Sequence, residues 1–225
     1  MLRHSLSTSV ILLWAAGSAL VVSPANAQTP LTKAVISALR NQVRLLPNRQ
    51  AARPAKLADV MSPGDGLSTA RSSLAELRFN DGTLARMGEH AVFRFVPQTR
   101  NFRLANGTVL LLIPPGQGRT QIKTPNVTAG IRGSALFVRY DTATNTSIVG
   151  SLTDSGIEVM NVSGSQRQVL KAGQMVITVD DQIQGLYNFD LEAFYETSAL
   201  VEGLELDNSQ EQGPDAAIAR CAKRP

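Results

Sequence analysis

LAELRFNDGTL, residues 74–84, is the stretch that decides the fold class. Apolar and polar side chains alternate between Ala75 and Phe79, and the run leads into Asp81-Gly82, a pair typical of the tight turn between two antiparallel strands. Similar short β-rich runs recur up to Val179, separated by Gly, Asn, Asp and Pro, with no amphipathic helix between them. The pattern argues against a parallel α/β sheet and predicts an all-β body.

The expected strands follow from these runs. They are residues 42–46, 74–79, 93–96, 102–104, 109–113, 136–140, 146–149, 157–162 and 175–179. Asn106-Gly107-Thr108 predicts a second tight turn, between the runs 102–104 and 109–113. Because residues 109–113 (VLLLI) are apolar on both faces, we expect a central buried strand there. These strands suit a rolled, solenoid-like or sandwich β-sheet.

Helices are expected only at the two ends of this body. Within residues 28–59, Val35, Ile36 and Leu39 have helical spacing and predict a short N-terminal helix, before the first strand and a Pro- and Arg-rich connection. The β-domain is expected at 60–185. An acidic C-terminal helix capped by Asp190 is expected at 186–207, and a flexible tail at 208–225.

Residues 1–27 have the features of a secretory signal peptide. Arg3 precedes the apolar run 10–22, and Ala25-Asn26-Ala27 matches the small-x-small cleavage pattern, so we expect the mature chain to begin at Gln28. The alternative is a retained anchor, but so short an apolar run does not span a hydrocarbon core of about 30 Å. We therefore expect export to the periplasm or cell exterior, with no membrane span after cleavage. Cys221 would then be an unpaired thiol.

Charge is distributed unevenly along the chain. Residues 28–139 contain 16 Lys/Arg and 5 Asp/Glu, whereas residues 140–225 contain 5 and 13. Strand alternation would place several basic residues opposite the apolar face, so we predict a surface for an anionic partner that comprises Arg78, Arg86, Arg94, Arg100, Arg103, Arg119, Lys123 and Arg132. Export disfavours nucleic acid and favours an envelope protein or an anionic glycan or lipid surface. Alternatively, these residues only pair with the acidic C-terminal segment.

An ordered series of turn motifs resembles the FecR-domain family of exported bacterial proteins, over roughly residues 43–176. The series runs PGDGLST (63–69), LRFNDGTL (77–84), NGTV (106–109), IKTP (122–125), IRGSALFV (131–138) and LKAGQ (170–174). Its motif turns carry Asp65, Asp81, Gly82, Thr124, Pro125, Gly133, Gly173 and Gln174. The chain departs from the family at Ser134 and Leu136, where Thr and Phe are usual.

The resemblance implies an exported β-module with a sensing or scaffolding role, and it carries no ligand. Iron-signalling members of the family have a cytoplasmic sigma-factor-binding segment and a membrane span before this domain. A chain that starts with a signal peptide is not expected to act alone as a transmembrane anti-sigma factor.

Residues suited to catalysis are few. His90 is the only histidine after residue 27, and neither a G-x-S-x-G nor an S-x-x-K nucleophile motif occurs. Carboxylate pairs could come from Glu76 with Asp81 or from residues 154 and 158, but these are ordinary strand and turn positions. Asp180-Asp181 is a weak calcium candidate. We expect no enzyme activity, cofactor or metal.

Two functions remain open from the sequence. The leading hypothesis is a non-catalytic exported module that senses or binds another cell-envelope component, as a part of envelope signalling. The alternative is a structural envelope or surface protein, such as an adhesin or a matrix subunit, whose β-body builds an assembly.

Overall fold

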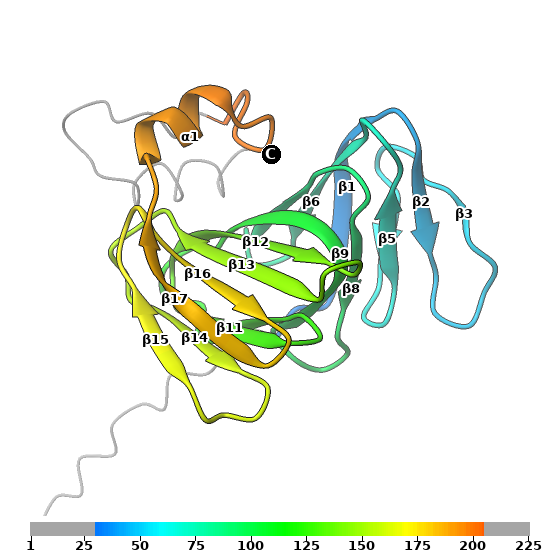
Figure 1. The fold of residues 1–225 in the computed structure, drawn as a ribbon. Coiled ribbons are helices and arrows are strands. Elements are labelled where there is room, and N and C mark those ends of the chain that lie inside the picture. The colour runs from blue at the N-terminus through cyan, green and yellow to red at the C-terminus, as the bar shows by residue number, and fades with distance from the viewer. Residues whose placement is uncertain (1–29, 205–225) are drawn as a thin grey trace, which may run out of the picture.

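The computed structural model describes residues 30–204. The expected signal peptide, the expected tail and residues 205–207 lie outside this range. Every strand belongs to one 17-stranded sheet, which folds over into two facing layers (Figure 1). The all-β prediction is confirmed, and the arrangement is sandwich-like.

The first layer carries the C-terminal helix on its outer face (Figure 1). Its strands are, in spatial order, β4 (Val60–Met61), β1 (Ala34–Arg40), β6 (Leu74–Phe79), β7 (Leu84–Met87), the second half of β9 (Asn101–Leu112), β12 (Ala135–Asp141), β13 (Thr146–Ser151), β16 (Gln174–Val179) and β17 (Gln182–Asn188).

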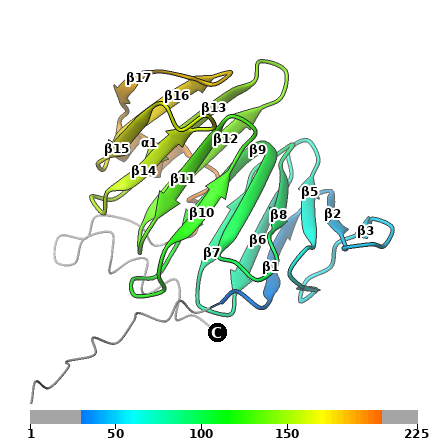
Figure 2. The ribbon, with the colours of Figure 1, turned by 90° about the horizontal axis from the view of Figure 1, so that it is seen from below.

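The second layer lies on the other side of the core and faces the viewer in Figure 2. Its strands are, in spatial order, β3 (Arg53–Pro54), β2 (Val43–Leu46), β5 (Gly66–Thr69), β8 (Val92–Phe95), the first half of β9, β10 (Thr120–Lys123), β11 (Val127–Ile131), β14 (Ile157–Asn161) and β15 (Arg167–Leu170).

The prediction of a tight turn at residues 106–108 is wrong, because strand β9 continues through these residues and joins the two layers. Its first half pairs with β8 and β10, and its second half with β7 and β12. Gly107, with φ +83°, bends this continuous strand where it passes between layers. A Cβ at Gly107 would lie 2.4 Å from the Cα of Ala91, so the close backbone approach requires glycine. The predicted buried strand is confirmed, because residues 109–112 are buried on both faces.

The N-terminal helix predicted from residues 31–40 is also wrong. Residues 34–40 form β1, which pairs with β4 and β6 and buries Ala34 and Ile36. The register of β1 against β6 shifts between Ile36 and Ala38. This bulge interrupts the two-residue period of a strand and leaves an apolar spacing that resembles that of a helix.

The core fills the space between the layers and includes a cluster of aromatic rings. Phe79 of the first layer meets Phe95 of the second at 5.3 Å between ring centroids, in an edge-to-face contact. Phe102 lies 5.1 Å from Phe79 and 5.2 Å from Phe93. Because Phe93, Phe95 and Phe102 point inward, the residues that alternate with them on β8 and β9 point to solvent.

The C-terminal helix α1 (Leu191–Thr197) is shorter than the segment predicted at 186–207, because β17 continues to Asn188. The predicted cap is confirmed: the Asp190 side chain accepts a hydrogen bond from the Ala193 N–H. Within the described part of the chain, no helix is long and apolar enough to span a bilayer.

Aromatic rings dock α1 on the outer face of the first layer. Phe194 stacks on Phe137 with 5.0 Å between the ring centroids. Phe137 lies directly over Gly150, where a Cβ would come within 2.2 Å of the ring. The hydroxyl of Tyr195 donates to the carbonyl of Leu152, and burial raises the pKa of Tyr195 to about 12. The helix is therefore held by its rings.

Candidate functional site

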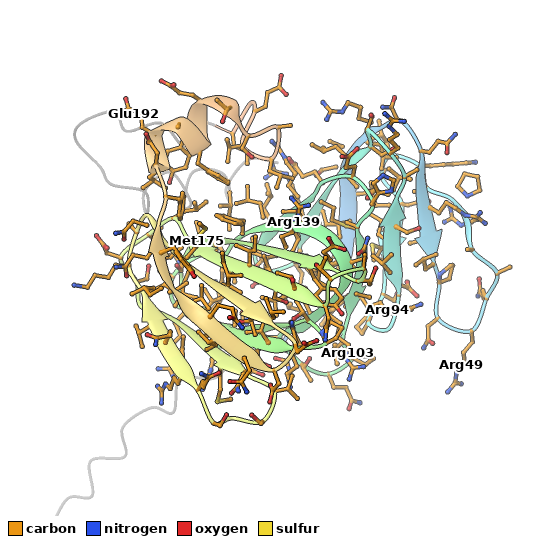
Figure 3. The ribbon with its side chains drawn as sticks, viewed as in Figure 1. Arg49, Arg94, Arg103, Arg139, Met175 and Glu192 are labelled. Carbon is orange, nitrogen blue, oxygen red and sulfur yellow. The ribbon has the colours of Figure 1, made fainter. Side chains whose placement is uncertain are left out.

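Three basic side chains form a row across the outer face of the second layer. Arg94 on β8 is directly opposite Arg103 on β9, which is directly opposite Lys123 on β10. All three are exposed, because they alternate with the buried Phe95, Phe102 and other core residues of these strands. We call Arg94, Arg103 and Lys123 the basic row. Figure 3 labels Arg94 and Arg103, which lie near one another.

The basic row has no acidic partner among residues 30–204. The one hydrogen bond from its side chains in this range is a long one, 3.4 Å from Arg94 to the carbonyl of Gly64. Like charges that face each other across strands destabilise a sheet. The row is therefore an arrangement that an anionic partner would stabilise.

Glu158 on β14 is the one acidic residue within the strands of the second layer. Asp65, next to the Gly66 that pairs with Arg94, is bound to the backbone N–H groups of Asn48 and Ser62. The Glu158 carboxylate forms an ion pair with Arg167 at 2.9 Å and a longer one with Arg119 at 3.6 Å. The Arg119 guanidinium lies over Gly130, where a Cβ would come within 2.9 Å of it. The negative charge of Glu158 is thus paired with Arg119 and Arg167. The three charges of the basic row have no acidic partner within residues 30–204.

Two residues predicted for the basic surface are buried, and that part of the prediction is wrong. The Arg86 side chain is 9% exposed and lies 2.6 Å from the carboxylate of Glu76, which is 7% exposed. The Arg100 side chain is 2% exposed and pairs at 2.5 Å with Asp81, which is fully buried. Each arginine is paired with a carboxylate because burial of an unpaired charge would strongly destabilise the folded protein.

The other predicted basic residues do not extend the row. Arg78 is half-buried on the outer face of the first layer, where it lies 3.3 Å from Glu76. Arg132 is exposed and follows the end of β11. Of the eight predicted residues, three therefore form the basic row, and Arg119 pairs with Glu158. The other four are Arg78, Arg86 and Arg100, which pair with other carboxylates, and Arg132.

Arg86 also fastens the C-terminal segment. Its guanidinium donates to the backbone carbonyls of Leu200 at 3.2 Å and Glu202 at 2.6 Å. Ser37 donates to Glu76 at 2.7 Å. Burial raises the pKa of Glu76, but the hydrogen bonds from Arg86 and Ser37, with the nearby guanidinium charges, outweigh burial and lower the pKa below its ordinary value. Strand β1, the β6–β7 hairpin and the C-terminal segment thus meet at this ion pair.

A groove of about 860 Å³ lies between α1 and the outer face of the first layer. Phe137, Ile148 and Met175 line it from the sheet, and Phe194 lines it from the helix. Arg139 on β12 and Met175 on β16 are labelled below α1 in Figure 3. Sequence reasoning missed this groove because docking of α1 creates it.

The residues considered for catalysis serve structural contacts. The carboxylates of Glu76 and Asp81 are each bound by a buried arginine, and Asp154 accepts the N–H of Ala172. His90 lies in the turn before β8, with φ +54°. Within residues 30–204, no group of three His, Cys, Asp or Glu side chains could hold a metal ion.

Comparison with known families identifies the central part of this body. Residues 65–151 match the FecR protein family. The chain carries a FecR domain. The FecR domain extends from β5 to β13, so it includes strands of both layers and all three residues of the basic row.

The fold is similar to two crystal structures of candidate anti-sigma factors from Parabacteroides distasonis, solved at 1.65 and 2.50 Å resolution. The first is 14% identical, with a TM-score of 0.51, and the match covers 56% of this chain and 61% of that chain. The second is 12% identical, with a TM-score of 0.50, over 59% and 64%. The match thus spans less than two thirds of either structure, and the likeness concerns the fold alone. No curated protein matches the chain.

The motif aspartates of the FecR domain close turns. Asp65 accepts hydrogen bonds from the backbone N–H groups of Asn48 and Ser62, both at 2.7 Å, and so ties two loops together. Asp81 and Gly82 form the turn between β6 and β7 that residues 74–84 predict. Beyond the turn, Asp81 holds the buried guanidinium at the start of β9.

The Thr-Pro motif connects the two layers. The hydroxyl of Thr124 lies 2.7 Å from that of Ser147 on β13. Pro125 lies in the turn between β10 and β11. Gly133 packs against Pro115. A Cβ at Gly133 would lie 2.7 Å from the Cα of Pro115.

The Gly-Gln motif lies beyond the matched residues and closes the turn before β16. The Gly173 N–H donates to the carbonyl of Ser151, and the Gln174 side chain accepts the N–H of Lys171, both at 3.0 Å. The motif turns therefore make contacts within the fold, whereas the basic row faces outward.

Proposed function

We propose that this chain is a non-catalytic, exported binding module of the bacterial cell envelope. In this proposal it takes part in envelope signalling by binding another envelope component through the outer face of the second layer.

The basic row carries the proposal. Arg94, Arg103 and Lys123 face one another in direct register, with no acidic side chain among residues 30–204 to balance them. Such a row costs stability in the free protein, because like charges opposite each other in a sheet repel. An anionic partner would relieve this repulsion, because its negative charges would attract all three side chains. The positive charge of the row would also steer such a partner toward the outer face of the second layer.

The FecR domain supports the signalling part of the proposal. The solved structures of similar fold are described as candidate anti-sigma factors, which are regulatory proteins. The features of a signal peptide in residues 1–27 support export.

The test is capture from envelope fractions by the mature protein, with proteins, glycans and lipids analysed separately. The variant R94Q/R103Q/K123Q removes the row. The control R40Q/R49Q/R71Q removes three exposed basic residues elsewhere on the protein, so both variants have the same net charge. We expect the wild type and the control to retain one defined component that the row variant loses.

Two results contradict the proposal. One is the absence of any component whose retention depends on the row. The other is self-association of the purified chain into large particles that does not depend on the row, which supports the structural alternative of an adhesin or matrix subunit.

A further inference from the structure

We infer that the partner of the basic row is an acidic polysaccharide, a linear chain with regularly repeated acidic groups, which lies across strands β8, β9 and β10. The inference rests on the proposed function and names the chemistry of the partner at the same surface.

The geometry of the row fits an extended chain. Neighbouring strands lie about 4.8 Å apart, so the three charges form a straight track perpendicular to the strands. The same track continues across β11 at Thr128 and β14 at Met160. It reaches Arg167 on β15, roughly 24 Å from Arg94 at the same spacing. A single small anion would use only part of such a track.

The surroundings of the row disfavour a protein partner. Protein interfaces depend on aromatic or large apolar anchors at their centre. The outward neighbours of the row are instead Asn101, Ala105, Gln121 and the half-buried Val92. The large exposed hydrophobic side chains of residues 30–204 lie on other elements, so apolar anchors for a protein or for insertion into a lipid surface are absent at these three strands.

Glu158 provides a test in the opposite direction. It neutralises Arg119 and Arg167 beside the track and would repel an anionic chain there. Replacing it with glutamine releases two guanidinium groups toward the track. If the basic row were purely structural, E158Q would tighten the binding of a polyanion no more than the loss of any other single acidic charge, whereas the proposed track requires a larger effect.

The experiment is calorimetric titration of the full mature protein with a heparin-derived oligosaccharide as the probe, at several salt concentrations. We expect R94Q/R103Q/K123Q to weaken binding about tenfold or more. The slope of log affinity against log salt should fall by roughly 2, because each lost contact with a polyanion contributes about 0.7–0.9. The control R40Q/R49Q/R71Q should stay within about twofold of the wild type, and E158Q should bind more tightly. Thermal melting checks that each variant is folded.

Four results overturn the inference. They are an equal loss in the control triple variant, unchanged binding in the row variant, weaker binding by E158Q, and equal row-dependent affinity for poly-glutamate or for phosphatidylglycerol vesicles. If envelope capture depends on the row while oligosaccharide binding does not, the polyanion inference fails and the proposed function stands. If neither depends on it, both fail.

Discussion

Replacing Arg86 with methionine should destabilise the protein far more than replacing an exposed arginine. Arg86 lies 2.6 Å from Glu76, and both side chains are almost completely buried. Methionine has a similar length but cannot donate hydrogen bonds to the carboxylate or to the carbonyls of Leu200 and Glu202. The variant therefore strands a buried carboxylate and unfastens the C-terminal segment from the sheet.

The expected loss is about 3–5 kcal/mol at pH 7, the usual result of removing one partner from a buried ion pair. The loss should depend on pH. Because the pKa of Glu76 is lowered in the folded protein, the ion pair stabilises the fold above the ordinary carboxyl pKa of about 4.3 and stops doing so as the pH falls through the lower folded value. In R86M, burial without the guanidinium raises the pKa of Glu76. The difference from wild type should therefore shrink below about pH 4.

Urea unfolding at pH 7 and at a pH below about 4 measures these differences in the free energy of unfolding. R71M is the matched control, because Arg71 is exposed, and it should cost less than about 1 kcal/mol. The double variant E76Q/R86M should recover part of the loss, since it removes the stranded charge. A cost of R86M below about 1 kcal/mol, or a cost equal at both pH values, would refute the role assigned to this ion pair.

Three further predictions concern other parts of the fold. Gly107→Ala should cost roughly 3–5 kcal/mol in urea unfolding, because the methyl group meets neighbouring backbone at a positive φ; a cost below about 1 kcal/mol contradicts the bend. Phe194→Ala removes the ring stacked on Phe137, so limited proteolysis should cut near α1 faster while the sheet stays resistant. E192Q/E196Q should leave binding of the heparin-derived oligosaccharide within about twofold, since α1 lies on the opposite layer from the row; tighter binding contradicts this.

Local patterns in the sequence predict the hairpins well. The turn at Asp81-Gly82 places Glu76 directly opposite Arg86, as the register of β6 and β7 confirms. That register was a signal that could have identified the buried ion pair, because a hairpin of known turn fixes which residues face each other. The burial of Arg86 was still not predictable, since it depends on the C-terminal segment that covers it.

Long-range pairing is the part that sequence patterns do not supply. The sequence pattern predicts a helix in place of β1 because the bulge interrupts the alternation. It predicts two strands in place of β9 because an Asn-Gly pair can bend a strand as well as reverse it. Alternation correctly predicts that Arg94 and Arg103 point outward. The position of Lys123 beside Arg103 follows from a parallel pairing of β9 and β10, and no turn signal encodes that pairing.

The outer faces of the two layers have opposite character, and this separates part of the acidic C-terminal charge from the basic row. The first layer carries apolar side chains such as Leu110 and Leu152 on its outer face, and α1 with residues 198–204 covers them. That segment, which contains Glu192, Glu196 and Glu202, therefore lies on the side of the first layer away from the second layer (Figure 1). Two sheets stacked about 10 Å apart separate the two charges by more than the screening length of about 8 Å at physiological salt. As far as Leu204, the chain thus does not neutralise its own basic row, and the charge of the row is left for a partner.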